Sequence, residues 1–292
     1  MSKPFKVACI QMTTDRDVGP SMDTIERFAR EARDAGADLI TTPECASMIE
    51  AGRKNVLAKA VDESQDESLA RFRALASETG AWMLAGSLII KVEPDRCANR
   101  SFLIDPNGNV VSRYDKIHMF DVDLDGGESY RESRTYRPGE RAVIAPTPWG
   151  PLGMTICYDM RFPHLYRHLA QAGAKFLTVP SAFTRPTGRA HWHTLLRARA
   201  IETGCYVIAP AQCGEHPSGR KTYGHSVVID PWGTVIAEAG EQPEVILASI
   251  DPARVDEVRG QVPSLNSQPT FTHVAPDKAN DDAPALSAAR DD

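Results

Sequence analysis

The feature that most restricts the fold of this chain is a duplicated pattern of helix end, glycine turn and apolar strand. Residues 35–43 read AGADLITTP and residues 172–180 read AGAKFLTVP, and both segments close in proline. A second repeat follows in the same order: the turns DPNGN at 105–109 and DPWGT at 230–234 each precede valine and join apolar segments. Two similar α-β halves, packed sheet on sheet with helices outside, account for this order.

The spacing of apolar residues predicts the other elements of both halves. Segments typical of strands are 6–11, 37–42, 82–90, 101–104, 110–114, 151–156, 175–179, 226–229, 235–238 and 244–250. Segments typical of helices are 22–35, 66–79, 162–171 and 189–203, with Gly204 as the end of the last one and a short helix beginning near 251. We therefore expect the α/β class, as a four-layer α/β/β/α sandwich. We also expect a single domain over residues 1–274 and a disordered tail at 275–292.

Charge and hydropathy exclude several classes of partner. The 292 residues carry a formal net charge of −6, whereas a general nucleic-acid binder needs a basic surface. The longest nearly apolar run, 81–90, is about half of the ~20 residues that a bilayer span requires, so no membrane contact is expected. The N-terminus leads directly into a strand without a secretory signal, which predicts a cytoplasmic protein.

The six cysteines form no C-x-x-C pair, and Cys9 and Cys205 lie in apolar strand-like runs where buried, inert thiols are expected.

Two predicted strands end in charged residues that could act in catalysis. Glu44 directly follows the strand and proline of ITTP, at the kind of strand end where ligands meet α/β sheets. Its carboxylate is a candidate general base, and a solvated loop residue is the alternative. Lys116 ends the returning strand of the first hairpin, in YDKIH. Its ammonium could stabilise an oxyanion, and a surface lysine is the alternative.

A third strand delivers Cys157 to a sharp strand-to-helix turn, in ICYDMRFP. Such a turn exposes a nucleophile and points amide groups, here the Tyr158 N–H, toward a developing oxyanion. An ordinary thiol has a pKa of about 8.5, so this cysteine needs a base or a cation to react at neutral pH. A small buried residue is the alternative at this position. A base, a cation and a thiol at three strand ends form a more specific set than any one of them.

The segments TTPE, YDKIH, RES and ICYDMRFP resemble those of the nitrilase superfamily of carbon-nitrogen hydrolases, across residues 5–265. The resemblance implies an αββα fold and a catalytic triad of Glu44, Lys116 and Cys157. It also implies that Glu132, in RES, helps to position the triad. The segments 180–214 and 223–235 look most like the Nit branch. That branch implies a cysteine-dependent amidase for a small carboxylate-bearing amide, most closely deaminated glutathione; an omega-amidase for α-ketoglutaramate or succinamate and an N-carbamoyl amino acid amidohydrolase are the alternatives.

The same resemblance extends to the substrate pocket and the assembly. It implies that Phe183 and Thr187 line the pocket, that no cofactor is used, and that the chain forms a homodimer or larger homo-oligomer. Arg161 is a candidate cation for the substrate carboxylate because a guanidinium binds a carboxylate with two hydrogen bonds; a structural salt bridge is the alternative.

The sequence departs from the usual pattern of the branch at two places. Arg189 stands where the branch commonly has proline, and SLNSQPTF lacks the branch's usual His-Arg pair. Four apolar residues of the helix 189–203 are expected to be core or dimer contacts: Leu195, Leu196, Ala198 and Ile201.

Other functions fit the sequence less well. His164 and His168 are one helical turn apart, and His191 and His193 flank Trp192, but no H-E-x-x-H motif or third ligand at a telling interval is present. We therefore expect no metal site. The local cysteine signature of papain-like enzymes is missing. A non-enzymatic scaffold is disfavoured because charged residues at partly buried strand ends are costly without a task.

Overall fold

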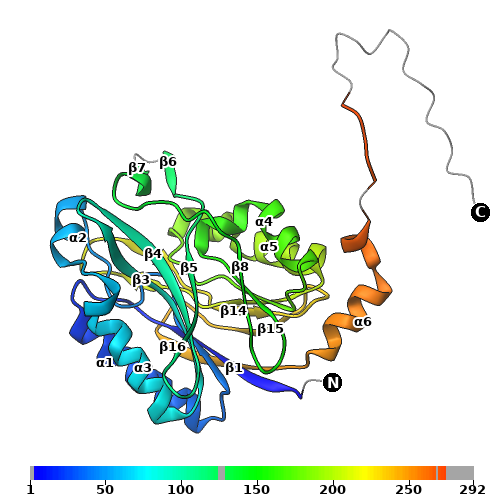
Figure 1. Ribbon diagram of the computed structural model, residues 1–292, viewed down its shortest axis with the longest axis horizontal. Coiled ribbons are helices and arrows are strands. Elements are labelled where there is room, and N and C mark those ends of the chain that lie inside the picture. Colours follow the sequence, from blue (N-terminus) through cyan, green and yellow to red (C-terminus); the bar gives the residue numbers. More distant parts are fainter. Residues whose placement is uncertain (1–2, 124–128, 268, 274–292) are drawn as a thin grey trace, which may run out of the picture.

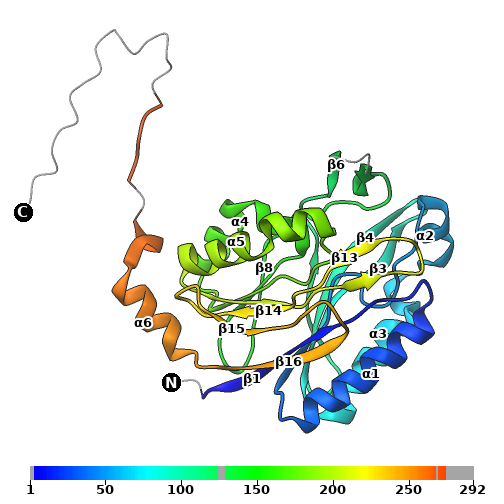
Figure 2. The same ribbon diagram turned by 180° about the vertical axis from the view of Figure 1, so that it is seen from behind.

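The computed structural model describes residues 3–123, 129–267 and 269–273. Two six-stranded sheets pack face to face between two layers of helices (Figure 1 and Figure 2). Helices α1 (Val18–Asp34) and α3 (Glu67–Thr79) cover the first sheet, and α4 (Pro163–Gln171) and α5 (Arg185–Thr203) cover the second. The predicted α/β/β/α sandwich is confirmed.

The first sheet has the strand order β16-β1-β2-β3-β4-β5. Its strands are β1 (Phe5–Gln11), β2 (Leu39–Thr41), β3 (Trp82–Glu93), β4 (Arg96–Ile104), β5 (Val110–Asp115) and β16 (Glu244–Ile250). Alternate residues of β1 face opposite layers, as in any strand. Val7 and Cys9 pack into the core between the sheets, whereas Ala8 and Ile10 pack against α1 and α3.

The second sheet repeats the pattern of the first, with the order β15-β14-β11-β10-β9-β8. Its strands are β8 (Val143–Ala145), β9 (Leu152–Met154), β10 (Phe176–Thr178), β11 (Tyr206–Ala209), β14 (Val227–Ile229) and β15 (Val235–Glu238). Each sheet holds three parallel strands, one antiparallel strand beside the first of them and an antiparallel hairpin beside the third. The two AGA repeats lead into β2 and β10, so the duplicated sequence corresponds to a duplicated structure.

The repeated turns are also built alike. In the β4-β5 turn, Asp105 Oδ1 accepts hydrogen bonds from the amides of Asn107 and Asn109, both at 2.9 Å. In the β14-β15 turn, Asp230 Oδ1 accepts from the amides of Trp232 and Thr234, at 2.9 and 2.8 Å. The aspartate that begins each DPxG turn therefore fixes it in the same way.

The remaining elements are short, and most were not expected from the sequence. They are α2 (Arg53–Lys59), α6 (Ala253–Gln261), the two-stranded sheets β6 (Asp121–Asp123) with β7 (Ser129–Arg131) and β12 (Cys213–Glu215) with β13 (Lys221–Tyr223), and the 3-10 turns η1 (Glu63–Gln65), η2 (Glu132–Arg134), η3 (Cys157–Arg161) and η4 (Pro263–Asn266). Helix α5 begins four residues before the expected start because Pro186 fits the first turn of a helix. It ends at Gly204, as expected, in a left-handed conformation with φ of 58°.

The structure also bears on several smaller expectations from the sequence. Cys9 and Cys205 are buried, and burial raises the pKa of the Cys9 thiol to about 12, which makes it inert. No helix in the described ranges combines the length and the hydropathy that a bilayer span requires. The tail at 275–292 lies outside the described residues, so its disorder and the single domain over 1–274 stay predictions.

Candidate active site

Three of the predicted residues converge at the carboxyl ends of three strands. Glu44 follows β2 and Lys116 follows β5, which run in the same direction, and Cys157 follows β9 of the other sheet. The Lys116 Nζ lies 2.8 Å from Glu44 Oε1 and 2.9 and 3.0 Å from the two oxygens of Glu132. All four residues line one cavity of about 490 Å³.

The backbone brings the two sheets close together at this point. A Cβ atom on Gly86, in β3, would lie 1.9 Å from the carbonyl oxygen of Thr42 and 2.7 Å from the Cβ of Pro180. Only glycine fits there. Because Thr42 directly follows β2 and Pro180 follows β10, the cognate strand of the second half, this contact places the two duplicated strand ends side by side.

Cys157 has the backbone geometry of a nucleophile on a tight turn. Its φ of 48° lies in the left-handed region, which is strained for a residue other than glycine. Its amide donates to the carbonyl of Pro180 at 3.0 Å, which fixes the turn against the neighbouring strand end. Tyr158 is the second residue of η3, where an amide has no acceptor within the helix, and it lines the cavity. Its N–H therefore suits the predicted role toward an oxyanion.

The charges of the site favour a carboxylate base beside a neutral thiol. Burial of Glu44 opposes its ionisation, but the positive charges of Lys116 and Arg220 outweigh that effect and lower its pKa. Burial also disfavours the charged form of Lys116, but Glu132 and Glu44 raise its pKa well above the ordinary value. Burial and the charge of Glu44 raise the pKa of the Cys157 thiol well above its ordinary value. At rest the site therefore holds a neutral thiol beside an ionised Glu44.

Comparison with known proteins places this chain in a family. The family model described as carbon-nitrogen hydrolase matches residues 6–260. The chain belongs to the carbon-nitrogen hydrolase family. It is 41% identical over 268 residues to a deaminated glutathione amidase of Synechocystis, covering 90% of this chain and 97% of that protein.

Solved structures of relatives share the fold of this carbon-nitrogen hydrolase. The NitFhit protein of Caenorhabditis elegans superimposes with a TM-score of 0.86 at 36% identity, covering 91% of this chain and 65% of that longer one. A Saccharomyces cerevisiae member of branch 10 of the nitrilase superfamily superimposes with a TM-score of 0.83 at 30% identity, covering 93% and 98% of the two chains. The enzyme is therefore a hydrolase of carbon-nitrogen bonds other than peptide bonds, as the sequence predicts.

Asp159 ties the Cys157 turn of this hydrolase to the segment that carries Lys116. It is fully buried, and its Oδ2 accepts hydrogen bonds from the Tyr114 hydroxyl at 2.7 Å and from the Ile156 amide at 2.9 Å. Its Oδ1 accepts from the His118 amide at 3.0 Å and contacts the His118 ring nitrogen at 2.7 Å. Tyr114 and His118 lie two residues on either side of the lysine. Asp159 therefore fixes the distance between the thiol and the ammonium, a role that sequence reasoning missed.

Sequence reasoning also missed two polar residues beside the triad, one bonded directly to Glu44 and the other linked to it through Ala182. Asn99, in β4, donates its side-chain amide to Glu44 at 2.9 Å and to Glu132 at 3.2 Å. Arg220 lies in the loop between β12 and β13, and its Nη2 donates to the carbonyl of Ala182 at 2.6 Å. The Ala182 amide in turn donates to Glu44 Oε2 at 2.9 Å. No motif at these positions could have identified them, because they reach the site only through the tertiary fold.

The structure separates the three predicted substrate-binding residues. Phe183 and Thr187 line the cavity. Arg161 is absent from that lining: its guanidinium lies 5.5 Å from the centre of the Phe183 ring and 5.9 Å from that of Tyr158, and its Nη2 lies 3.2 Å from the His191 ring nitrogen. It therefore contacts the two aromatic rings and His191 rather than the cavity. Among the described residues no carboxylate forms an ion pair with Arg161, so the alternative of a structural salt bridge has no support.

His216, in the loop that carries Arg220, is expected to make the stability of the protein depend on pH. Its ring is buried between the Thr14 carbonyl at 2.9 Å and the Thr222 hydroxyl at 2.8 Å. Burial lowers its pKa to about 4, below the roughly 6.5 of an unfolded chain. Since the unfolded state then binds the proton more tightly, this histidine should reduce the free energy of unfolding by about 3 kcal/mol as the pH falls from 7 to 4.

The matching measurement is urea unfolding between pH 4 and 7 for the wild type and for His216→Gln. Glutamine can keep a hydrogen bond and has no proton to gain, so the variant should lose less stability at low pH than the wild type. An identical pH dependence in both proteins would show that His216 does not contribute.

Proposed function

We propose that this carbon-nitrogen hydrolase is an amidase that cleaves deaminated glutathione by covalent catalysis at Cys157. The observation that carries the mechanism is the contact of Lys116 with both glutamates in the cavity that Cys157 lines. The substrate is supported by the name of the Synechocystis relative, a deaminated glutathione amidase at 41% identity. In this proposal the enzyme needs no cofactor.

The first half of the reaction forms a thioester. Glu44 takes the thiol proton as the Cys157 sulfur attacks the amide carbonyl. The Lys116 ammonium and the Tyr158 amide hold the oxyanion, and such a donor is typically worth ~3–4 kcal/mol. Glu44 then delivers the proton to the departing amine as the carbon-nitrogen bond breaks. For deaminated glutathione, cysteinylglycine leaves and an α-ketoglutaryl group remains on the sulfur.

The second half hydrolyses that thioester. Glu44 takes a proton from water, the hydroxide attacks the thioester carbonyl, and α-ketoglutarate leaves as the Cys157 sulfur recovers its proton. Glu132 acts as a positioning residue. Its two oxygens bind the Lys116 ammonium, and its Oε2 also accepts the Phe120 amide at 2.6 Å. It thereby keeps the cation aimed at the oxyanion in both halves.

Arg220 is the residue best placed to bind the substrate carboxylate. It lines the cavity and is half-buried, and its Nε is buried without a hydrogen-bond partner among the described residues. A keto-acid carboxylate would satisfy that donor and neutralise the guanidinium. Phe183 and Thr187 would then contact the carbon chain of the substrate, and Arg161 would act through the Phe183 ring that it covers.

Arg220→Met is expected to lower kcat/KM for deaminated glutathione about 10- to 100-fold, the effect of losing one hydrogen bond to a charged group. Arg220 also lowers the Glu44 pKa, so its removal should shift the acid limb of the pH-rate profile to higher pH. Steady-state kinetics across pH measure both effects. With propionamide, which has no carboxylate, the variant should shift the acid limb but leave KM unchanged. If Arg161→Met instead causes the larger loss, Arg161 binds the carboxylate.

The substrate itself is tested by a panel of amides. We expect kcat/KM to be highest for deaminated glutathione, compared with α-ketoglutaramate, succinamate, an N-carbamoyl amino acid and a simple nitrile. Preference for α-ketoglutaramate would make the enzyme an omega-amidase, and preference for the nitrile would contradict the amidase proposal.

We further propose a homodimer in the cytoplasm. Three large apolar side chains line one shallow cavity beside the end of α5 and are about half exposed: Ile201 at 53%, Trp232 at 51% and Val262 at 49%. A second copy of the chain would cover them. The cytoplasmic location is supported by the cysteines: all six are free, as expected in a reducing compartment. Sedimentation velocity should give a dimer for the wild type and a smaller species for Trp232→Glu; equal values for both would exclude this surface.

A further inference from the structure

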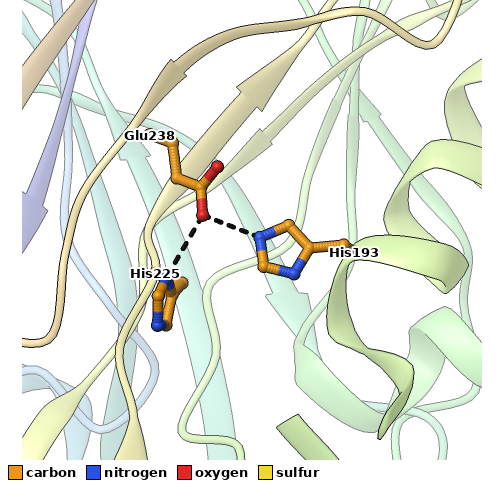
Figure 3. A group of neighbouring side chains, drawn as sticks. All are labelled: His193, His225 and Glu238. Carbon is orange, nitrogen blue, oxygen red and sulfur yellow. Dashed lines mark hydrogen bonds and ion pairs between the residues drawn. The ribbon is translucent and has the colours of Figure 1, made fainter. Parts of the chain in front are cut away.

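Three metal-ligating side chains gather outside the active site, between α5 and the β14-β15 hairpin (Figure 3). His193 comes from α5, His225 lies just before β14, and Glu238 ends β15. One ligand atom from each lies within 4.8 Å of the other two. The side chains are 34%, 22% and 36% exposed, respectively, so an ion from solvent can reach them.

Two of the three distances between these atoms are close to those in a zinc site. The Oε1 of Glu238 lies 2.8 Å from Nε2 of His193 and 3.1 Å from Nδ1 of His225. Bonds of about 2.0–2.1 Å to a tetrahedral ion place neighbouring ligand atoms about 3.3 Å apart. To admit the ion, each ring nitrogen would therefore have to move only a few tenths of an ångström away from the Glu238 oxygen, and the two ring nitrogens would have to settle at about the same spacing from a starting distance of at most 4.8 Å. Figure 3 shows both rings directed at the same carboxylate.

His225 is held in its position by the surrounding structure. Its φ of 57° lies in the left-handed region, which is unfavourable for histidine. Its carbonyl accepts the Trp192 indole N–H at 2.7 Å, and its amide donates to Gly240 at 3.1 Å. Its ring stacks on Tyr223 with 4.4 Å between ring centres. A strained residue fixed on three sides presents its ring nitrogen without further ordering, which favours ligand binding.

We propose that His193, His225 and Glu238 bind a zinc-type divalent cation, with water in the fourth position. Two imidazoles and one carboxylate are ligands that Zn²⁺ accepts, and hard cations such as Mg²⁺ prefer all-oxygen sites. The ion would join α5 to the edge strand β15. Because Trp192 bonds His225 and its ring lies 5.0 Å from that of Phe183, the bound metal would also steady one wall of the active-site cavity.

The sequence did not predict this site because its ligands come from separate segments. In the sequence His193 pairs only with its neighbour His191, and this pattern predicts no metal site. The residues that complete the group lie on the hairpin after α5, at 225 and 238, and no motif relates those intervals to metal binding.

The experiment is zinc binding to the full-length Cys157→Ala protein, since this background removes the active-site thiol as a competing ligand. Isothermal titration with ZnCl₂ should give one site per chain, and CoCl₂ should produce the visible absorption of a four- or five-coordinate ion. In the same background, His193→Ala should abolish binding. Glu238→Gln should weaken it at least about 10-fold, because an amide oxygen is a poorer zinc ligand than a carboxylate.

A matched control is His168→Ala, which removes one of two histidines on the exposed face of α4 and should leave zinc affinity unchanged. Circular dichroism checks that each variant is folded. Absence of zinc binding in the Cys157→Ala protein, or binding that survives both His193→Ala and Glu238→Gln, would overturn the proposal. Neither outcome depends on the activity of the enzyme, so this test is independent of the proposed function.

Discussion

Cys157→Ala is expected to lower kcat for deaminated glutathione by at least about 10⁴-fold while the protein stays folded. Alanine removes the only atom that forms the thioester and leaves the binding cavity and its charges in place. The substitution is small, and the side chain it removes is 7% exposed, so little packing is lost. Release of α-ketoglutarate measures the activity, and thermal unfolding measures the fold.

Cys45→Ala is a closely matched control for this substitution. Cys45 also lines the cavity, adjoins Glu44 in the chain and has a positive φ, of 54°. Burial and the Glu44 charge raise the pKa of its thiol to about 12. The Cys45 variant should keep most of its activity, because it does not stand at the strand-to-helix turn. A large loss in this control, or activity that survives Cys157→Ala, would contradict the assignment of the nucleophile.

Lys116→Met is expected to damage stability and activity together. The Lys116 and Glu44 side chains are 2% and 4% exposed, and that of Glu132 is 13% exposed. Removing the cation leaves the buried carboxylate of Glu44 and the partly buried one of Glu132 without their shared ion-pair partner, and breaking a buried pair typically costs about 3–5 kcal/mol in the free energy of unfolding. Loss of the oxyanion donor should reduce kcat by a further 10²- to 10³-fold, on the order of other such donors. Urea unfolding and steady-state kinetics measure the two effects.

The double variant Lys116→Met with Glu132→Gln separates these two roles. It removes one of the uncompensated charges, so it should regain part of the lost stability. It should not regain activity, because the oxyanion still lacks its cation. A single variant as stable as the wild type would contradict the buried ion-pair account. Recovery of activity in the double variant would contradict the catalytic role of the lysine.

The fold was predictable from the sequence because its signals are local and repeated. The AGA segments and the DPxG turns each specify their own conformation, and the burial of β2 and β10 explains their apolar runs. The start of α5 and the elements α2, β6-β7 and β12-β13 were harder to predict from the sequence. The last three are short and polar, and their conformations depend on contacts with distant residues.

The residues of the candidate site likewise fall into those that the sequence identifies and those that it does not. Glu44 and Cys157 were identifiable because each directly follows an apolar strand, and a strand end has a known direction in a sheet. Asn99 and Arg220 were not identifiable, because one is a polar residue within a strand and the other lies in a loop between two three-residue strands. Their places in the site arise from contacts across the fold, which no local pattern encodes. The positioning role proposed for Glu132 rests on the family resemblance, because its own surroundings in the sequence do not indicate one.

The covalent step is tested most directly by rapid-quench mass spectrometry of the wild-type enzyme with deaminated glutathione. During the first turnover, the intact protein should gain the mass of one α-ketoglutaryl group, and peptide mapping should place that group on Cys157. Hydroxylamine should discharge it as the hydroxamate. A full burst of cysteinylglycine with no acylated protein, or with the acyl group on another residue, would contradict the account.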